Sequence, residues 1–306
     1  MDFTVEVERS LRVLDGAVAV FCAVGGVEPQ SETVWRQADK YTVPRIAFVN
    51  KMDRVGADFE NVIRMMEDRL GAKPVPTQMP MILAEQFTGV IDLVDMRAIT
   101  YHEESQGTTF DEHDIPRDLI EAANRARFHL LETVAEFDEQ LLDDYLHEKP
   151  YTSDDLRRAI RSGTLQGRIT PVLCGSAFKN KGVQKLLDAV VEFLPSPLDK
   201  PPIQGQDAET FEHVERRPED GAPFAALAFK IMTDPYVGKL TFFRVYSGTV
   251  QTGDSVFNTL TGRSERIGRL VQMHANKREE ISQVFAGDIA AGIGFKKVTT
   301  GSTCAT

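Results

Sequence analysis

The segment Ile46-Ala-Phe-Val-Asn-Lys-Met-Asp53 decides the fold of this protein. Its first four residues are all apolar and do not alternate with polar ones, so we expect a strand that is buried on both faces, as in a parallel sheet. The next four residues include an amide, an ammonium and a carboxylate group. Ligands of open parallel sheets bind beyond the carboxyl ends of the strands. The segment therefore predicts a parallel sheet with a ligand site at its edge.

Strands and helices alternate around this segment. Two other uninterrupted apolar runs predict parallel strands that are buried on both faces, over 17–22 and 170–174. Apolar residues at helical spacing predict helices over 4–14, from Ser31 through Trp35 and Ala38, over 59–70 and over 183–194. This alternation specifies a doubly wound α/β domain, with helices on both faces of a parallel sheet.

Residues 72–166 interrupt the alternation. Short strands are expected over 79–82, 89–92 and 98–101, and one long amphipathic helix over 117–146. Because unstructured loops of this length are rare in compact domains, we expect an inserted α+β subdomain. The helix carries many carboxylates, which form either a solvated polar face or a docking surface for a basic partner. They include Glu132, Glu136, Asp138, Glu139, Asp143 and Asp144.

The last third of the chain has a different pattern. Four prolines between 195 and 202 and a polar acidic stretch predict a linker outside regular structure over 201–220. Evenly spaced short strands then predict a small antiparallel β-barrel over 221–306. These strands are expected over 225–231, 240–247, 255–258, 267–274 and 289–292. The fold class is thus α/β followed by all-β, with the α/β domain formed by 1–71 and 167–200 and interrupted by the insert.

The composition excludes several classes of protein. The chain has 306 residues, with 35 Lys and Arg against 46 Asp and Glu and a net charge of −11. No apolar run is long enough to cross a bilayer and the three cysteines are dispersed, so we expect a cytoplasmic protein without a disulfide or metal framework. Residues 221–306 contain ten Lys and Arg against six Asp and Glu, which leaves −15 for residues 1–220. The acidic total therefore does not exclude an RNA partner.

The polar end of the opening segment suits a guanine base. An ionised Asp53 accepts two parallel hydrogen bonds from adjacent donors, which guanine offers on one edge and adenine does not. The alkyl stem of Lys51 is long enough to lie across the base, with the ammonium near the sugar, and Asn50 is expected to brace neighbouring loops. The alternative is a capped helix start after a strand.

A second loop follows the predicted strand 170–174. It reads Gly175-Ser-Ala-Phe-Lys-Asn-Lys-Gly182, and backbone N–H groups in such a loop point at an acceptor, here the guanine carbonyl oxygen. Ser176 is expected to brace the turn and Lys179 to cover the opposite face of the base. The alternative is a simple strand-to-helix turn. The predicted base site comprises Asn50, Lys51, Met52, Asp53, Ser176, Ala177, Phe178 and Lys179.

Both segments resemble those of bacterial-type elongation factor G, and the resemblance covers essentially the whole chain. It also includes the runs Phe229-Lys-Ile-Met232, 234–248, Met273-His-Ala-Asn276 and 286–290. The resemblance implies a GTPase domain of the P-loop type that binds GTP or GDP with Mg²⁺, and a ribosome-bound factor that drives translocation of transfer and messenger RNA. It further implies that the barrel contacts ribosomal RNA, through phosphate neutralisation by Arg263, Arg266, Arg269, Lys277 and Arg278.

The sequence also departs from that family. No Gly-x-x-x-x-Gly-Lys-Ser/Thr motif is present, and Met1 stands at the last position of the family's Asp-Thr-Pro-Gly-His-Val segment. We therefore expect an incomplete GTPase domain with no catalytic residue and no Mg²⁺ ligand, and without the family's further carboxyl-terminal domains. We expect this chain by itself to bind guanine nucleotides weakly and not to hydrolyse GTP.

Two further expectations follow from the incomplete domain. Strands missing from the sheet would leave an apolar edge open, so the chain is expected to self-associate through Ala17–Cys22 or its neighbours. A different class of function also stays open, in which the chain is a noncatalytic module that binds the ribosome or RNA. Within the enzyme class, the alternatives are a ribosome-protection protein and a peptide-release GTPase.

Overall fold

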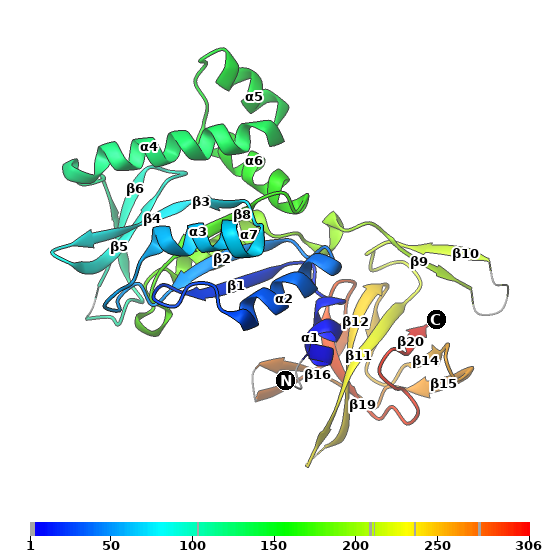
Figure 1. Cartoon of the computed structure of the whole chain (residues 1–306). Helices are drawn as coiled ribbons and strands as arrows, with labels where there is room; N and C mark the ends of the chain where they lie inside the picture. The colour runs from blue at the N-terminus through cyan, green and yellow to red at the C-terminus, as the bar shows by residue number, and fades with distance from the viewer. Residues whose placement is uncertain (1–3, 103, 208–209, 211, 236, 275–276) are drawn as a thin grey trace. The chain divides into compact units, whose positions relative to one another are not determined.

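The structure is a computed structural model that describes residues 4–306 except 103, 208–209, 211, 236 and 275–276 (Figure 1). Met1 and the motif residues Tyr236, Ala275 and Asn276 lie outside the described residues. The chain divides into two compact units, one of residues 15–195 and one of residues 1–14 with 196–306. No helix among the described residues is long and apolar enough to span a membrane.

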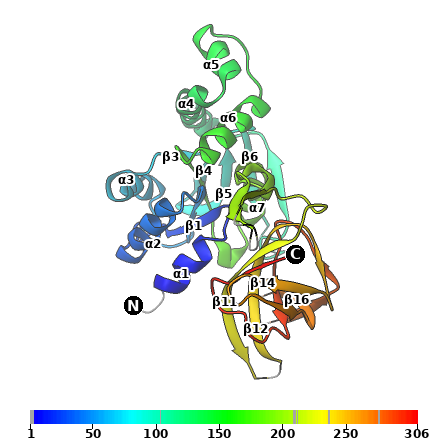
Figure 2. The ribbon, with the colours of Figure 1, turned by 90° about the vertical axis from the view of Figure 1, so that its right-hand side faces the viewer.

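The first unit contains the parallel sheet predicted from the sequence. Its strands are β1 (Ala17–Cys22), β2 (Arg45–Asn50), β8 (Thr170–Cys174) and β3 (Pro74–Pro76), hydrogen-bonded in the order β1-β2-β8-β3. Ile46 and Phe48 pack with α7 (Val183–Phe193) on one face, and Ala47 and Val49 with α2 (Pro29–Lys40) and α3 (Phe59–Leu70) on the other. The α/β expectation is therefore confirmed, with helices on both faces of the sheet (Figure 2).

The expectation that β1 is buried on both faces is wrong. Val18 is 36% exposed and Val20 is 58% exposed. In the described sheet β1 is the outermost strand and pairs with β2 alone, in the register Val18↔Ile46. On this face α7 covers the residues of β2 but not those of β1. Part of the uninterrupted apolar run of β1 therefore stays exposed in this unit.

The insert forms a second, antiparallel sheet. Its strands are β4 (Gln78–Leu83), β5 (Gln86–Asp92), β6 (Arg97–Tyr101) and β7 (Phe110–His113), in that order. The preceding strand β3 lies in the range expected for the insert, but it pairs with β8 in the main sheet. The three predicted strands are confirmed, and β7 was not predicted.

The helices of the insert correct the sequence analysis. The expected single helix over 117–146 is broken into α4 (Arg117–Val134), a 3₁₀ turn (Ala135–Phe137) and α5 (Glu139–Leu146). Asp138 causes the break, because its backbone is extended and its carboxylate accepts from the N–H of Leu141, 2.9 Å away, as an N-cap. A further helix, α6 (Ser153–Leu165), was missed, although Thr152 and Asp155 form a capping box at its start.

Several carboxylates of this region are paired. Glu136 bonds to Lys73 at 2.9 Å, and Asp138 lies 3.2 Å from Arg158. Asp143 bonds to Lys149 at 2.5 Å. These three carboxylates therefore pair with cations of the same unit. For the other carboxylates, a docking surface for a basic partner stays a prediction.

The second unit is mostly antiparallel sheet, as predicted. Eight strands pair in the order β15-β14-β20-β11-β12-β19-β16-β17, and Figure 2 labels β11, β12, β14 and β16 among them. Their bounds are β11 (Ala225–Asp234), β12 (Gly238–Ser247), β14 (Ser255–Asn258), β15 (Arg263–Arg266), β16 (Arg269–His274), β17 (Lys277–Ile281), β19 (Ile289–Ile293) and β20 (Thr303–Ala305). β13 (Val250–Gln251) and β18 (Gln283–Val284) form a separate pair. The short helix α1 (Thr4–Leu11) belongs to this unit.

The absence of regular structure expected over 201–220 is wrong. β9 (Ile203–Gln206) and β10 (His213–Arg216) form an antiparallel pair in this stretch. The side chains of this strand pair are mostly polar and little buried, so the sequence has no alternation of apolar and polar residues that would predict the strands.

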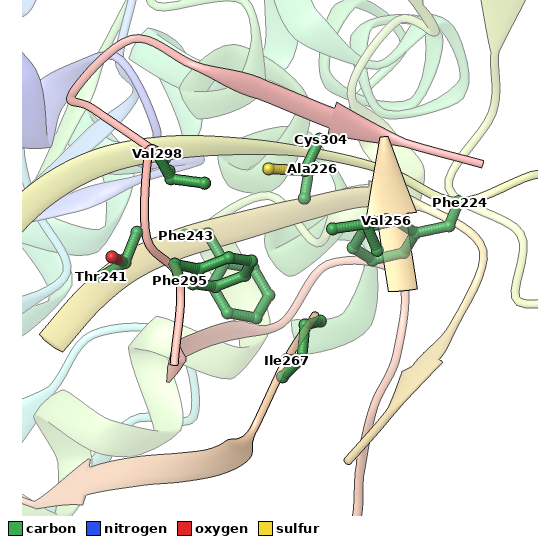
Figure 3. Close-up of a pocket in the computed structure, with 10 residues that line it drawn as sticks. Phe224, Ala226, Thr241, Phe243, Val256, Ile267, Phe295, Val298 and Cys304 are labelled. Atoms are coloured by element: carbon green, nitrogen blue, oxygen red, sulfur yellow. The ribbon is translucent and has the colours of Figure 1, made fainter. Parts of the chain in front are cut away.

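The core of the second unit contains a small cavity, of about 10 Å³ (Figure 3). Its lining is almost wholly apolar and includes Phe243 and Phe295, whose rings meet edge to face at 6.3 Å. A space of this size is at the lower limit for one water molecule, and the lining offers few polar partners. It is packing space in the core, not a ligand site.

Candidate functional site

The two segments predicted to hold a base lie together. They follow β2 and β8, which are adjacent parallel strands with Val49 opposite Cys174, so both segments leave the sheet at the same edge. The backbone joins them directly, since the N–H of Gly175 donates to Val49 O at 3.0 Å and the N–H of Met52 to Gly175 O at 3.1 Å. We call residues 50–54 the first loop and residues 175–182 the second loop.

Asn50 bridges the two loops. Its Oδ1 accepts from the N–H of Lys51 at 2.8 Å and from the N–H of Ala177 at 2.9 Å. One side chain at the end of β2 thus satisfies a donor of each loop. This is the bracing arrangement expected of an amide at this position.

The backbone of the first loop is strained. Lys51 has φ of 66°, in the left-handed region that a residue with a Cβ adopts at a cost of about 1–2 kcal/mol. The N–H of Arg54 then closes a turn onto Lys51 O at 3.1 Å. Met52 is 4% exposed and packs in the core, so its side chain anchors the loop and is not placed to contact a ligand.

The carboxylate of Asp53 is held from the second loop. Ser176 Oγ donates to Asp53 Oδ1 at 2.7 Å, and Lys179 Nζ lies 3.5 Å from Asp53 Oδ2. Burial alone would raise the pKa of Asp53, but the hydrogen bond from Ser176, a backbone N–H and the Lys179 ammonium together hold that pKa below its usual value. Each oxygen has a second lone-pair direction, so this anionic carboxylate can still accept from a ligand.

The second loop is closed on itself. Ser176 N–H donates to Lys181 O at 2.8 Å and Lys181 N–H returns a bond to Ser176 O at 3.0 Å, while Lys179 N–H also donates to Ser176 O. The N–H groups of Ser176, Ala177 and Lys179 are therefore used within the two loops, and a base acceptor that met one of these three would have to share it. Phe178 is 97% exposed.

The arrangement is suited to reading the edge of a planar polar ring. It presents one oriented carboxylate beside Lys179, and the first loop adds a second exposed lysine, Lys51; the alkyl stem of a lysine can cover a ring face. Among the residues that the structure describes, no group of three His, Cys, Asp or Glu side chains could hold a metal ion.

The five cations predicted to contact RNA lie on three strands of the second unit. Arg263 and Arg266 lie on β15, at one end of the strand order, and the other three lie on β16 and β17 at the other end. Arg269 pairs with Glu280 at 2.9 Å and Arg278 with Asp234 at 2.8 Å. All five residues, Arg263, Arg266, Arg269, Lys277 and Arg278, are exposed.

Two further exposed cations lie in the second unit. Lys296 and Lys297 are exposed between the buried residues Phe295 and Val298. Their backbone N–H groups both donate to the buried carboxylate of Glu265, at 2.8 Å each. The signal in the sequence was the pair of adjacent lysines flanked by apolar residues, but the clamp by Glu265 comes from a strand about thirty residues earlier.

Two family models match the chain, and it is also similar to proteins of known structure. The model of the elongation factor Tu GTP-binding domain matches residues 1–196, and the model of elongation factor Tu domain 2 matches residues 238–305. A protein of known crystal structure from Thermus thermophilus superposes with a TM-score of 0.82 at 26% sequence identity, over 100% of this chain and 42% of that one. The chain therefore spans less than half the length of that protein.

Proposed function

Because this chain belongs to the family of the elongation factor Tu GTP-binding domain, a family of translational GTPases, we propose that its two joined loops bind the guanine base of GTP and GDP in a ribosomal translocase of the elongation factor G type. One observation carries the proposal. The carboxylate of Asp53 is ionised, oriented by Ser176 and flanked by Lys179 at the carboxyl edge of the parallel sheet.

Asp53 supplies the selectivity. Guanine presents two adjacent donors to an ionised carboxylate, and each such charged hydrogen bond contributes about 1.5–3 kcal/mol. Adenine lacks that pair of donors, and binding it would leave the partly buried carboxylate without its partners, which costs a comparable amount. The bond from Ser176 fixes the direction of the carboxylate before a base arrives, so less conformational entropy is lost on binding.

The lysines and Asn50 complete the site. Lys51 and Lys179 contribute alkyl stems on the two faces of the base, and the ammonium of Lys179 stays beside Asp53 Oδ2. Asn50 keeps the loops at a fixed separation through its two hydrogen bonds. Mg²⁺ accompanies the nucleotide in translational GTPases, but the described residues offer no ligand cluster for it, so we assign this chain no step that uses the metal.

Support for a translocase comes from the sequence run from Phe229 to Gly248, which includes parts of β11 and β12, together with the inserted subdomain. The exposed arginines and lysines of the second unit would then neutralise phosphates of ribosomal RNA. We place the protein in the cytoplasm, and we predict that residues 1–306 alone do not turn over GTP. We also retain as predictions the division into 1–71 with 167–200, 72–166, 201–220 and 221–306.

A nucleotide titration tests the base site. Labelled GDP and labelled xanthosine diphosphate are titrated into the chain, into Asp53→Asn and into Asp58→Asn. Asp58 caps α3 through the N–H of Asn61, a role that asparagine also performs, so it controls for loss of a nearby charge. We expect Asp53→Asn alone to shift preference from guanine to xanthine by tenfold or more, about 1.4 kcal/mol. An unchanged preference would remove Asp53 from base recognition, and RNA binding without guanine binding would favour a noncatalytic module.

A further inference from the structure

A turn of the insert lies directly against the second loop. We call residues Ser105–Thr108, between β6 and β7, the insert turn. The carbonyl of Gln106 accepts from Asn180 Nδ2 at 3.0 Å, and the carbonyl of Gly107 accepts from Gln184 Nε2 at 2.9 Å. Asn180 belongs to the second loop and Gln184 to the first turn of the helix that follows it. Two hydrogen bonds therefore connect the insert to the segment that carries Lys179.

The two backbones are in closest contact at Gly107. This residue is buried, with φ of +74°, and a Cβ built on it would lie 2.1 Å from the carbonyl oxygen of Lys179 and 3.1 Å from the carbonyl carbon of Asn180. Ordinary contact for a Cβ begins near 3.4 Å. No side chain larger than hydrogen fits here unless the backbone of Lys179 moves. The ammonium of Lys179 lies beside the carboxylate of Asp53. The insert turn therefore contacts the backbone of a residue whose side chain belongs to the base site.

The insert turn is itself firmly held. Gly107 N–H donates to His102 O at 2.9 Å and Thr108 N–H to Ser105 O at 3.2 Å. On the next strand, Glu112 Oε1 pairs with Lys185 Nζ at 2.8 Å, one residue beyond Gln184 on α7. A turn braced in this way transmits a displacement of the insert to the second loop and does not absorb it in its own backbone.

We propose that Gln106 and Gly107 are positioning residues for the base site, which make the affinity for guanine nucleotide depend on the placement of the insert. This inference rests on the proposed function, because it assigns Lys179 and Asp53 to the base. Displacement of the insert by a partner moves the Lys179 backbone and weakens binding of the nucleotide. Because coupling between sites is reciprocal, bound nucleotide also stabilises the insert turn.

The test compares two glycines of the same backbone conformation. Gly107→Ala forces the contact with Lys179, whereas Gly167→Ala introduces the same strain at φ of +68° with nothing within 4 Å. Both variants carry the cost of a Cβ at positive φ, and Gly107→Ala is expected to lose further thermal stability through the contact with Lys179. Only Gly107→Ala is expected to weaken GDP binding, about tenfold, and to speed amide hydrogen exchange over residues 176–181 with exchange in α3 unchanged, since a misplacement of about 1 Å at a binding group is costly.

A second variant keeps the test independent of strain. Asn180→Gly preserves the left-handed backbone at φ of 53° and removes the donor to Gln106 O. It is expected to speed exchange over 176–181 and to raise the GDP dissociation rate, with unchanged preference for guanine over xanthine. If both variants match Gly167→Ala in exchange and in GDP affinity, the inference is overturned while Asp53 keeps its role. If the chain binds no GDP, it is the proposed function that fails, and the exchange measurement then shows only whether the insert turn positions the second loop.

Discussion

Ser176→Ala tests the electrostatic preparation of the base site. The substitution removes a buried hydroxyl that donates to Asp53 Oδ1 at 2.7 Å, and it leaves the Lys179 ammonium 3.5 Å from Oδ2. A hydrogen bond to a charged group contributes about 1.5–3 kcal/mol. The side chain of Asp53 is only 17% exposed, so solvent screens little of this. We expect unit 15–195 to lose about 2 kcal/mol of unfolding free energy at pH 7.

The loss depends on pH, with a definite sign. The pKa of Asp53 is lower in the folded protein than its ordinary value of 3.8. Such a group stabilises the folded state above its unfolded pKa, and the stabilisation disappears as the pH falls through the folded pKa. Below that point Asp53 is protonated in both states and its bond to Ser176 is neutral. The penalty of Ser176→Ala is therefore expected to shrink to about 1 kcal/mol in acid.

Urea unfolding of the full chain at pH 7 and at the lowest pH where it stays folded measures both values. Ser153→Ala is the matched control, because Ser153 Oγ donates to the uncharged carbonyl of Val94 at 2.8 Å. Its penalty is expected to be about 1 kcal/mol at both pH values. A carboxyl carbon titration by NMR is expected to show the pKa of Asp53 higher in Ser176→Ala. Equal penalties for Ser176→Ala at the two pH values, with an unmoved pKa of Asp53, would refute the reasoning.

Three other predictions follow from the same structure. Backbone hydrogen bonds from neighbouring residues lower the pKa of the Cys22 thiol, whereas burial raises the pKa of the other two, so iodoacetamide is expected to label Cys22 first, as read by peptide mass spectrometry. Val20→Glu on the exposed face of β1 is expected to reduce self-association; light scattering that shows a monomeric wild type at high concentration would contradict it. Glu265→Ala is expected to lower the unfolding free energy by about 2 kcal/mol in urea unfolding, because the N–H groups of Lys296 and its neighbour lose a buried acceptor. The control Glu280→Ala removes only an exposed ion pair and is expected to cost about 0.5 kcal/mol.

The main sheet could be predicted because its signals are local. β2 and β8 are uninterrupted apolar runs followed at once by polar loops, and α3 begins after Asp58 and ends at Gly71, whose φ is 61°. The rule that ligands bind at the carboxyl ends of parallel strands then brought the two loops together from the sequence alone. The same reasoning failed for β1, because the exposure of a strand depends on which strands lie beside it. An apolar run does not show whether its strand lies at the edge or in the centre of a sheet.

The details of the site could not be predicted because they join distant parts of the chain. The bond from Ser176 to Asp53 spans 123 positions, and the bond from Asn180 to the carbonyl of Gln106 spans 74. No periodicity or spacing rule relates residues so far apart. Gly107 also looked like any turn glycine, since only the close approach of Lys179 shows why a hydrogen atom is needed there.

The route of the chain explains why the insert lies against the base site. β3 and β8 are parallel neighbours with Pro76 opposite Val172, and the insert joins the carboxyl end of β3 to the amino end of β8. The carboxyl ends of parallel strands share one edge, so the insert leaves the main sheet at the edge where both loops begin. Its turn meets the second loop without any intermediate segment. The coupling free energy between two sites is the same in both directions. If the insert turn positions Lys179, bound GDP must therefore slow amide exchange at Ser105–Thr108. If GDP does not change the exchange rate there, the contact between the insert turn and the second loop is packing alone.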